Sequence, residues 1–417
     1  MTPQMPQSKP TGFFDRFFFD AAAAATAESN LYIGGVLLLG GAPPDFTLLH
    51  RYLADQATQV PALRYRLSAR RTHWEVDPGF TPGNHIDEVR LDQGADVLAA
   101  AMDAIGRPLQ PERPLWGLTA LHGHSSDEYA LCYRAHHAFQ DGMGMLQTAA
   151  GLLSTPRQHA NRATAGKTTS FWPWLSPTGL GIPLRRTARW SESSNPLTGH
   201  RALRSAHLDV ARLQAIAEAT GASFNQICLT VLTGALRAWT PHDWTQPTSA
   251  RARRGLHVAV PLDLRPTGSE LDPGNHLGVV RVALPCTESA PLTQLRHIRA
   301  QTGPARLRRH RNLHRSLLNA LPYKTARSMM LRIVDPRHTV MVVSTLDAPA
   351  ALTFAKAPIL GLHALPPLLP GHRGMVVFIR HHNIVTASLV FDNAVADTER
   401  LPGLMHEATN QLHALVS

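Results

Sequence analysis

The order of strand-like and helix-like segments predicts a mixed α/β fold with mixed sheets, built in two halves. Short apolar runs bounded by glycine alternate with segments of helical periodicity in both halves of the 417 residues. Between the halves, residues 154–196 are rich in Thr, Pro, Gly, Arg and Trp and show no sustained periodicity, as is typical of a long connection. We therefore predict domains at residues 1–153 and 197–417, joined by a connecting segment at 154–196.

In the first half, an aromatic segment running into a helix and several strand-like runs follow one another. LYIGGVLLLGG has the apolar, glycine-bounded character of a buried strand, and Asp45 is a suitable N-cap for the helix after it. The aromatic segment and its helix cover 13–28, and further helices are predicted at 45–58 and 96–105. The predicted strands cover 31–41, 73–80, 85–91, 116–123 and 128–137.

The second half repeats this pattern. SFNQICLTVLTGALRAW is a largely apolar helix, for which Ser223 is the expected N-cap. The other predicted helices cover 210–220 and 397–415, and the predicted strands cover 202–210, 256–265, 277–285, 338–346, 374–380 and 384–391.

Composition excludes several classes of protein. A hydrophobic share of 44% and a charged share of 17% are those of an ordinary globular chain, not a disordered one. Cys132, Cys228 and Cys286 lie far apart in apolar surroundings, so the sequence predicts neither a zinc site nor a disulfide framework. We expect a cytoplasmic protein, because no apolar run is long enough to span a membrane and the N-terminus does not have the order of a signal peptide.

The formal net charge of +11 comes almost entirely from arginine. Residues 296–332 mix basic residues with leucines at near-helical spacing, which fits a solvated helix face, or a surface for lipid headgroups or a phosphate-bearing substrate. No nucleic-acid-binding motif accompanies the charge, so nucleic acid is not an expected partner.

One segment combines residues suited to catalysis. A predicted strand ends at His136 and His137, and a turn with Asp141 and Gly142 follows it. A catalytic imidazole needs one nitrogen toward the substrate and the other held by a hydrogen bond. Asp141 is placed to hold the loop through an arginine or backbone amides, and Gly142 allows close backbone approach or a positive φ. We predict no metal, because adjacent strand residues point to opposite faces and no third ligand has suitable spacing.

This HHxxxDG pattern resembles the bacterial wax ester synthase/diacylglycerol acyltransferase family, within the wider superfamily of chloramphenicol acetyltransferase and nonribosomal-peptide condensation domains. The similarity begins near Phe13 and runs to the C-terminus through ordered segments. These segments are LYIGG, PALRYRL, HWEVDPGF, RPLW, NPLTGHR, GASFNQICLTVLTGALR, PLDLRPTGSELDPGNHLG, PPLLPGH and FDNAVAD.

The resemblance implies two chloramphenicol-acetyltransferase-like domains with the active site at their interface, reached by tunnels from opposite faces. It implies that His137 is the general base of a cofactor-free acyl transfer, with His136, Asp141 and Gly142 in support. It also suggests Arg265 as the partner of Asp141.

Two alternatives remain for the donors that would stabilise the oxyanion: the backbone amides of the turn, or Asn275. Asn225 is either a hydrogen-bonding residue at a helix start or a catalytic group.

Four departures separate the chain from the family pattern. In the helix of the second half, Asn225-Gln226 replaces the usual Asn-Asp pair. VVSTLDAP, at residues 342–349, replaces an Asn-Val-Pro-Gly-Pro stretch. The connection after the first half is also shorter than in many members, and the start FFDRFFFD differs from the usual one. The substrate is therefore less firmly indicated than the fold or the chemistry.

The expected function is transfer of an acyl group from acyl-CoA to an alcohol, giving a wax ester or triacylglycerol type of product. One alternative is an enzyme of secondary metabolism that takes its acyl group from CoA or a carrier protein and forms an ester or amide. Another is a non-catalytic binding module, which the intact HHxxxDG residues oppose. The expected partners are the thioester donor, an alcohol or amine acceptor, a carrier protein, and the surface of a membrane or lipid body.

Overall fold

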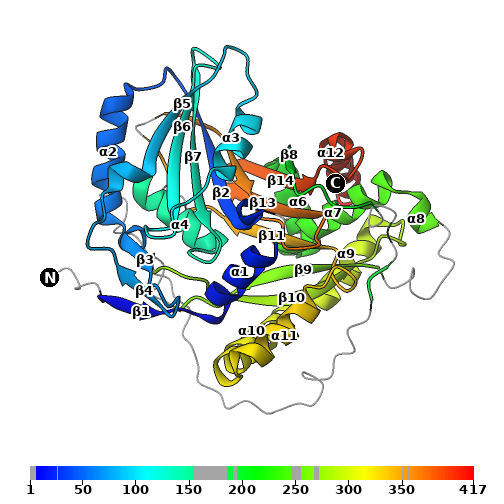
Figure 1. The fold of residues 1–417 in the computed structure, drawn as a ribbon. Helices are drawn as coiled ribbons and strands as arrows, with labels where there is room; N and C mark the ends of the chain where they lie inside the picture. The colour runs from blue at the N-terminus through cyan, green and yellow to red at the C-terminus, as the bar shows by residue number, and fades with distance from the viewer. Residues whose placement is uncertain are drawn as a thin grey trace. The chain divides into compact units, whose positions relative to one another are not determined.

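The computed structural model describes residues 6–25, 27–153, 186–188, 190, 195–245, 255–266, 272–349, 352–354 and 357–417 (Figure 1). Most of the predicted connecting segment, 154–196, lies outside these residues. The chain divides into two compact units, each described by itself below. Unit 1 comprises Met1–Gly166, Arg265–His276 and Leu346–Pro370, and unit 2 comprises Lys167–Leu264, Leu277–Thr345 and Gly371–Ser417.

Unit 1 is built on a five-stranded sheet with the strand order β12-β2-β7-β6-β5. Its strands are β2 (Tyr32–Gly40), β5 (Ile86–Arg90), β6 (Trp116–His122), β7 (Glu128–His136) and β12 (Ile359–Leu365). Neighbours are antiparallel except β5 and β6, which are parallel, so the sheet is mixed. The strands predicted at 31–41, 85–91, 116–123 and 128–137 are confirmed, whereas β12 was not predicted.

Two adjacent glycines of β2 allow helices to pack on opposite faces of this sheet. A Cβ on Gly34 would lie 2.8 Å from Ile105 Cδ1 of α3 (Val97–Gly106) and 2.6 Å from the carbonyl oxygen of Tyr133. A Cβ on Gly35 would face Met145 Cε of α4 (Gly142–Leu153) at 3.7 Å. Because successive strand residues alternate faces, α3 and α4 cover the two sides of the sheet.

The remaining elements of unit 1 form a small antiparallel sheet and peripheral helices. The sheet has the order β1-β4-β3. Its strands are β1 (Ser8–Pro10), β3 (Tyr65–Leu67) and β4 (His73–Val76). The helices are α1 (Phe13–Ala24) and α2 (Phe46–Gln59), with short 3-10 turns at Glu28–Leu31, Pro61–Arg64 and Pro82–His85. Asp45 caps α2 as predicted, since its Oδ1 accepts a hydrogen bond from Leu48 N at 3.1 Å.

Unit 2 contains a six-stranded mixed sheet with the order β10-β9-β11-β13-β14-β8. The pair β9–β11 is parallel, and β9–β10, β13–β14 and β8–β14 are antiparallel. Its strands are β8 (Arg201–Asp209), β9 (Leu256–Asp263), β10 (Leu277–Leu284), β11 (Met341–Asp347), β13 (Gly374–His381) and β14 (Ile384–Asp392). The predicted mixed α/β class is confirmed in both units.

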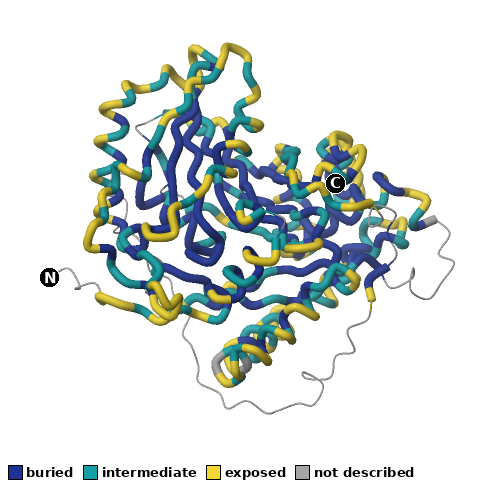
Figure 2. The backbone as a smooth tube through the Cα atoms, viewed as in Figure 1, coloured by how far each residue is buried: buried dark blue, intermediate teal, exposed yellow. Residues whose placement is uncertain are grey.

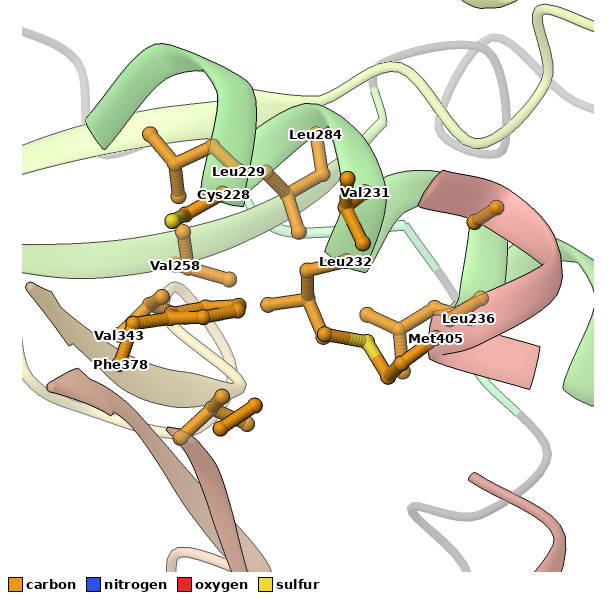
Figure 3. Close-up of a cluster of buried hydrophobic side chains, with 14 of the residues drawn as sticks. Cys228, Leu229, Val231, Leu232, Leu236, Val258, Leu284, Val343, Phe378 and Met405 are labelled. Atoms are coloured by element: carbon orange, nitrogen blue, oxygen red, sulfur yellow. The ribbon is translucent and has the colours of Figure 1, made fainter. Parts of the chain in front are cut away.

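The helices of unit 2 pack on this sheet around an apolar core. They are α6 (Val210–Thr220), α7 (Phe224–Trp239), α8 (His242–Thr245), α9 (Pro291–Gln301), α10 (Pro304–Ala320), α11 (Tyr323–Ile333) and α12 (Leu401–Ala414), with a 3-10 turn at Thr398–Arg400. In Figure 3, Leu232 and Leu236 of α7 lie beside Met405 of α12, and Phe378 of β13 lies to the left of Leu232, next to Val343 of β11. Figure 2 shows the strands largely buried, whereas α10 and α11 are mostly exposed or half-buried.

The α7 N-terminus explains one departure from the family pattern. Ser223 Oγ accepts a hydrogen bond from Gln226 N at 3.3 Å, and Gln226 Oε1 accepts one from Ser223 N at 2.9 Å, so the two residues form a capping box. Gln226 Nε2 also donates to Thr302 Oγ1 at 3.1 Å. Gln226 therefore closes the helix start with its hydrogen bonds satisfied, and the predicted Ser223 cap is confirmed.

The three cysteines are buried, and none of them takes part in a disulfide among the described residues. Burial raises the pKa of Cys132 and of Cys286 to about 12, so both are thiols at neutral pH. Across the part of the chain that the structure describes, no helix is both long and apolar enough to span a bilayer.

Candidate active site

The two motif histidines lie where β7 ends, and their backbone is held by neighbouring segments. His136 N donates to Leu115 O at 3.0 Å, and His137 N donates to Leu31 O at 2.9 Å. The chain then turns, and α4 begins at Gly142. The two side chains therefore project from a backbone fixed on both sides rather than from a free loop.

Phe18 and Asn275 hold the His137 ring. Phe18 of α1 stacks on the imidazole with a centroid separation of 3.7 Å and an interplanar angle of 15°. His137 Nδ1 and Asn275 Oδ1 are 3.1 Å apart. Only 8% of His137 is exposed. Phe18 thus covers one face of the ring, and Asn275 engages its Nδ1 nitrogen.

The neighbours of Asn275 determine which end of its amide meets His137. Asn275 Nδ2 lies 2.8 Å from His137 O, 3.0 Å from Ala138 O and 3.0 Å from Asp15 Oδ1, all of which are acceptors. The NH2 group must therefore face these oxygens, and the amide oxygen must face His137. An oxygen there requires that His137 Nδ1 donates, so in the neutral ring Nε2 carries the lone pair.

The electrostatic surroundings keep His137 neutral. Burial lowers the pKa of His137 below its ordinary value, because the charged imidazolium is poorly solvated there. Hydrogen bonding to its own backbone, the charge of Asp141 and hydrogen bonds to Asn275 and to the backbone of Gln140 partly oppose this effect. A neutral ring with its lone pair on Nε2 is the form that accepts a proton.

His136 has the opposite hydrogen-bond pattern. Its Nδ1 accepts a hydrogen bond from Ala138 N at 3.0 Å, so the neutral ring carries its proton on Nε2. That Nε2 is buried without a hydrogen-bond partner among the described residues, and Glu28 Oε1 is 3.8 Å away. Burial, together with His137 and Arg71, lowers the pKa of His136 to about 3. His136 is therefore a neutral residue that shapes the turn.

Asp141 and Arg265 form a buried ion pair beside the motif turn. Arg265 Nη2 donates to Asp141 Oδ2 at 2.7 Å, and the side chains are 4% and 1% exposed. Asp141 also accepts from His276 N at 2.9 Å and from Gly144 N at 2.8 Å. Burial alone would raise the pKa of Asp141, but the Arg265 charge and these amides hold it below the ordinary value. The carboxylate thus ties the turn to the first turn of α4.

The glycines around the turn are set by close contacts. Of the two possibilities for Gly142, the structure shows close approach, since a Cβ there would lie 3.3 Å from Leu346 Cδ1 and its φ is not positive. Gly144 is also restricted, because a Cβ would meet Arg265 Nη2 at 3.1 Å. Gly144 was not predicted as a site residue, although its place two residues after Gly142 puts it in the first turn of α4.

Residues 272–276 run alongside the motif turn. Gly274 N donates to Phe139 O at 2.6 Å, and Gln140 and Gly274 form a parallel bridge. Lys9 and Asp272 form an ion pair at the start of this segment. Gln140 is itself fixed, since its Oε1 accepts from Tyr133 OH and its Nε2 donates to Thr148 Oγ1, each at 2.7 Å. This second segment supplies Asn275 and His276 to the site.

The candidate residues therefore separate into two groups. The residues of the first group all belong to unit 1 and take part in the contacts described above. They are His136, His137, Asp141, Gly142, Arg265 and Asn275. Asn225 belongs to unit 2, on the first turn of α7, where its Oδ1 is buried with no hydrogen-bond partner among the described residues. Asp15 and Phe18 were not predicted as site residues, and the aromatic run FFDRFFFD was their only signal.

Comparison with known proteins identifies the class of fold and then the family. Solved structures similar over 98% of the chain include the wax ester synthase/diacylglycerol acyltransferase from Marinobacter aquaeolei VT8, with a TM-score of 0.66, 17% identity and 100% of that chain covered. They also include a starter condensation domain of rhizomide synthetase RzmA, with a TM-score of 0.65, 13% identity and 94% of that chain covered. The fold is thus the two-domain acyltransferase and condensation-domain fold.

Two family models match separate parts of the sequence. The wax ester synthase/diacylglycerol acyltransferase catalytic domain matches residues 22–172, and the C-terminal domain of the same family matches residues 273–413. A Mycobacterium tuberculosis protein named as a diacylglycerol O-acyltransferase is 26% identical over 87% of this chain and 84% of its own length. Another, tgs1, is 21% identical over 93% of this chain and 92% of its own.

The chain belongs to the wax ester synthase/diacylglycerol acyltransferase family and is an O-acyltransferase of that type. The resemblance noted from the motifs is confirmed.

Proposed function

We propose that the enzyme transfers an acyl group from acyl-CoA to the hydroxyl of an apolar alcohol, with His137 as the general base. The observation that carries this proposal is the hydrogen bond between His137 Nδ1 and Asn275 Oδ1. It places the lone pair on Nε2, where an acceptor hydroxyl can donate its proton.

In the proposed reaction, the acceptor oxygen loses its proton to His137 Nε2 as it attacks the thioester carbonyl carbon. The carbonyl π electrons move to oxygen and give a tetrahedral oxyanion. Collapse of this intermediate re-forms the carbonyl and breaks the carbon–sulfur bond, and the departing CoA sulfur takes the proton from Nε2. The ester and free CoA leave, and His137 returns to its neutral state without a covalent acyl-enzyme or a cofactor.

The other motif residues support the geometry of this step. The Asp141–Arg265 pair fixes the turn, and His136 accepts the Ala138 amide within it. Both hydrogens of the Asn275 amide point at carbonyl and carboxylate oxygens, which makes Asn275 a positioning residue for His137 and not the oxyanion donor. We assign the oxyanion to backbone amides in the first turn of α4, where a helix start leaves N–H groups without intrahelical partners.

The donor is proposed to be an anionic thioester. Residues 289–334 contain no Asp or Glu, and exposed Arg306, Arg308 and Arg309 lie on α10. Such a surface attracts the phosphates of CoA, those of a carrier-protein arm, or lipid headgroups. The names of the Mycobacterium relatives support diacylglycerol as one acceptor to test, and the name of the Marinobacter enzyme supports long-chain alcohols.

The proposal is tested by measuring CoA release. Purified enzyme is incubated with acyl-CoAs of several lengths and with long-chain alcohols, short alcohols or diacylglycerol. We expect acceptor-dependent release of CoA, and a loss of about 10²- to 10⁴-fold in kcat/KM for His137→Ala, the range typical of a general base. Circular dichroism serves to verify that the variant is folded.

The pH dependence gives a second test of the same residue. The base works only when unprotonated, and its pKa is lowered, so kcat/KM should fall on the acid side of a pKa below 6.5 and be level at neutral pH. Unchanged turnover in His137→Ala would refute the mechanism. An absence of CoA release with every acceptor would refute the CoA-dependent reaction and favour a carrier-protein donor and a condensing enzyme.

A further inference from the structure

Asp15 is a buried carboxylate that the proposed reaction does not use. It lies in the first turn of α1 and is only 2% exposed. The ion pairs among the described residues do not include it, and an unpaired buried charge is expensive for a protein to keep. Its position therefore needs an explanation beyond the folding of a short aromatic helix.

Four N–H groups surround this carboxylate. Oδ1 accepts from Asn275 N at 2.7 Å and from Asn275 Nδ2 at 3.0 Å. Oδ2 accepts from Gly12 N and from Trp74 Nε1, each at 2.9 Å. Burial raises the pKa of Asp15, and the four donors oppose that effect. Because every partner is a donor, the geometry fits the ionised carboxylate, which accepts in all four directions.

The chain beside Asp15 is shaped to its carboxylate. Gly274 has a φ of +93°, and a Cβ there would lie 2.8 Å from Asp15 Oδ2. A side chain at position 274 would therefore be strained and would also collide with the carboxylate. The glycine lets the backbone of Asn275 approach closely enough for its N–H to donate to Asp15.

We propose that Asp15 is a positioning residue that selects the tautomer of His137 through Asn275. This proposal rests on the assignment of His137 as the base. Asp15 Oδ1 binds both the backbone N–H and the side-chain NH2 of Asn275, and so fixes where the residue sits and how its amide is turned. The amide oxygen is then the group presented to His137 Nδ1.

The alternative orientation of the amide shows why the tautomer matters. If the Asn275 amide turned over, its oxygen would face Asp15 Oδ1 and the carbonyls of His137 and Ala138, which repels oxygen from oxygen. Its NH2 would then donate to His137 Nδ1, and the ring proton would move to Nε2. A ring protonated on Nε2 cannot accept the proton of the acceptor hydroxyl.

The test replaces Asp15→Asn, which keeps the size of the side chain but puts an NH2 group among N–H donors. We expect kcat to fall about 10- to 100-fold, less than the roughly 10⁴-fold loss seen when the residue that directly orients a catalytic histidine is made neutral in a serine protease. The KM for acyl-CoA should change little. Asp20→Asn makes the same change on the same helix, at a residue outside these contacts, and should keep the wild-type kcat.

A spectroscopic measurement separates positioning from a merely structural role. With ¹⁵N-labelled histidine, the imidazole shifts of His137, assigned by their loss in His137→Ala, report which ring nitrogen carries the proton. We expect the Nδ1–H form in the wild type and a mixture with the Nε2–H form in Asp15→Asn. Asn275→Ala should give the same mixture, and it keeps the proposal testable if Asp15→Asn does not fold.

Combining the variants tests whether Asp15 acts through Asn275. In the Asn275→Ala background, Asp15→Asn should cost little further activity, because the link to His137 is already lost. Fully additive losses, or a wild-type tautomer in either single variant, would overturn the proposal. The ring shifts are measured without substrate, so a wild type that releases no CoA would refute the proposed function while the shifts still decide the role of Asp15.

Discussion

Unit 1 buries charged groups around the histidine motif, whereas unit 2 packs its helices on its sheet through an apolar core. In unit 1, Asp15 and Asp141 are 2% and 1% exposed and are surrounded by N–H donors or by Arg265. In unit 2, the shared core is made of side chains such as Leu232 and Phe378, both fully buried (Figure 3). The buried groups around the motif thus orient polar atoms, whereas the core between α7, α12 and the sheet of unit 2 excludes water from apolar ones.

This difference bears on what each region contributes. Burial of apolar area stabilises a fold with little demand on direction. A buried ion pair contributes little net stability, because the cost of desolvation offsets the attraction. Removing one partner is destabilising, because it leaves a buried charge without an opposite charge beside it. We therefore expect substitutions in the apolar core of unit 2 to change stability alone, and substitutions around Asp141 or Asp15 to change both stability and turnover.

The largest effect is expected for Arg265→Ala. Removing the guanidinium leaves the buried Asp141 carboxylate with only two backbone amides, and the free energy of unfolding should fall by about 3–5 kcal/mol. Turnover by the remaining folded enzyme should also fall, since Asp141 fixes the turn that carries His137. Urea unfolding and CoA release measure the two effects.

The matched control is Arg337→Ala, which breaks the ion pair with Asp335 at the protein surface. The Arg337 side chain is 69% exposed, so solvent and salt already screen the attraction, and little change in the urea midpoint is expected. If the two variants lost equal amounts of unfolding free energy, burial would not explain a difference between the Asp141–Arg265 pair and the Asp335–Arg337 pair. A stable, fully active Arg265→Ala would remove Arg265 from the site.

The next effect is expected for Leu232→Ala in the core of unit 2. Leu232 is fully buried beside Met405, so the truncation leaves a cavity that costs about 3 kcal/mol of unfolding free energy. The folded fraction should keep the wild-type kcat and the wild-type dependence of kcat/KM on pH. A shifted pH profile with intact folding would contradict the assignment of stability alone to this core.

The site could be predicted from the sequence where its signals are local. His136, His137, Asp141 and Gly142 lie within seven positions of the chain, and the strand before them follows from its apolar pattern. Ser223 and Asp45 were predictable as caps because each bonds within one helical turn. Arg265 and Asn275 entered only through resemblance to the family, since nothing near them in sequence indicates their partners.

The parts that were missed depend on contacts between distant segments. The bonds from Asn275 to Asp15 join residues 260 positions apart, and no periodicity in FFDRFFFD distinguishes a positioning carboxylate from a helix-start residue. The strand β12 was missed because it is defined by pairing with β2, more than three hundred residues earlier. Such features are fixed by tertiary packing, which a single sequence does not show.

The smallest expected effect concerns acid stability and compares the buried His136 with the exposed His382. Between its ordinary value of 6.5 and its folded pKa of about 3, His136 binds a proton in the unfolded chain but not in the folded one. Stability should therefore fall as the pH falls through this range, by about 2 kcal/mol from this residue between pH 6.5 and pH 5.

His136→Asn keeps an acceptor for the Ala138 amide but does not titrate, so its urea midpoint should decline less between these pH values. His382→Asn is the control, because Asn tolerates the φ of 49° at this exposed strand end and should leave the decline as in the wild type. Identical declines in His136→Asn and the wild type would show that His136 is protonated in the folded enzyme, and its role as a neutral residue of the turn would have to be abandoned.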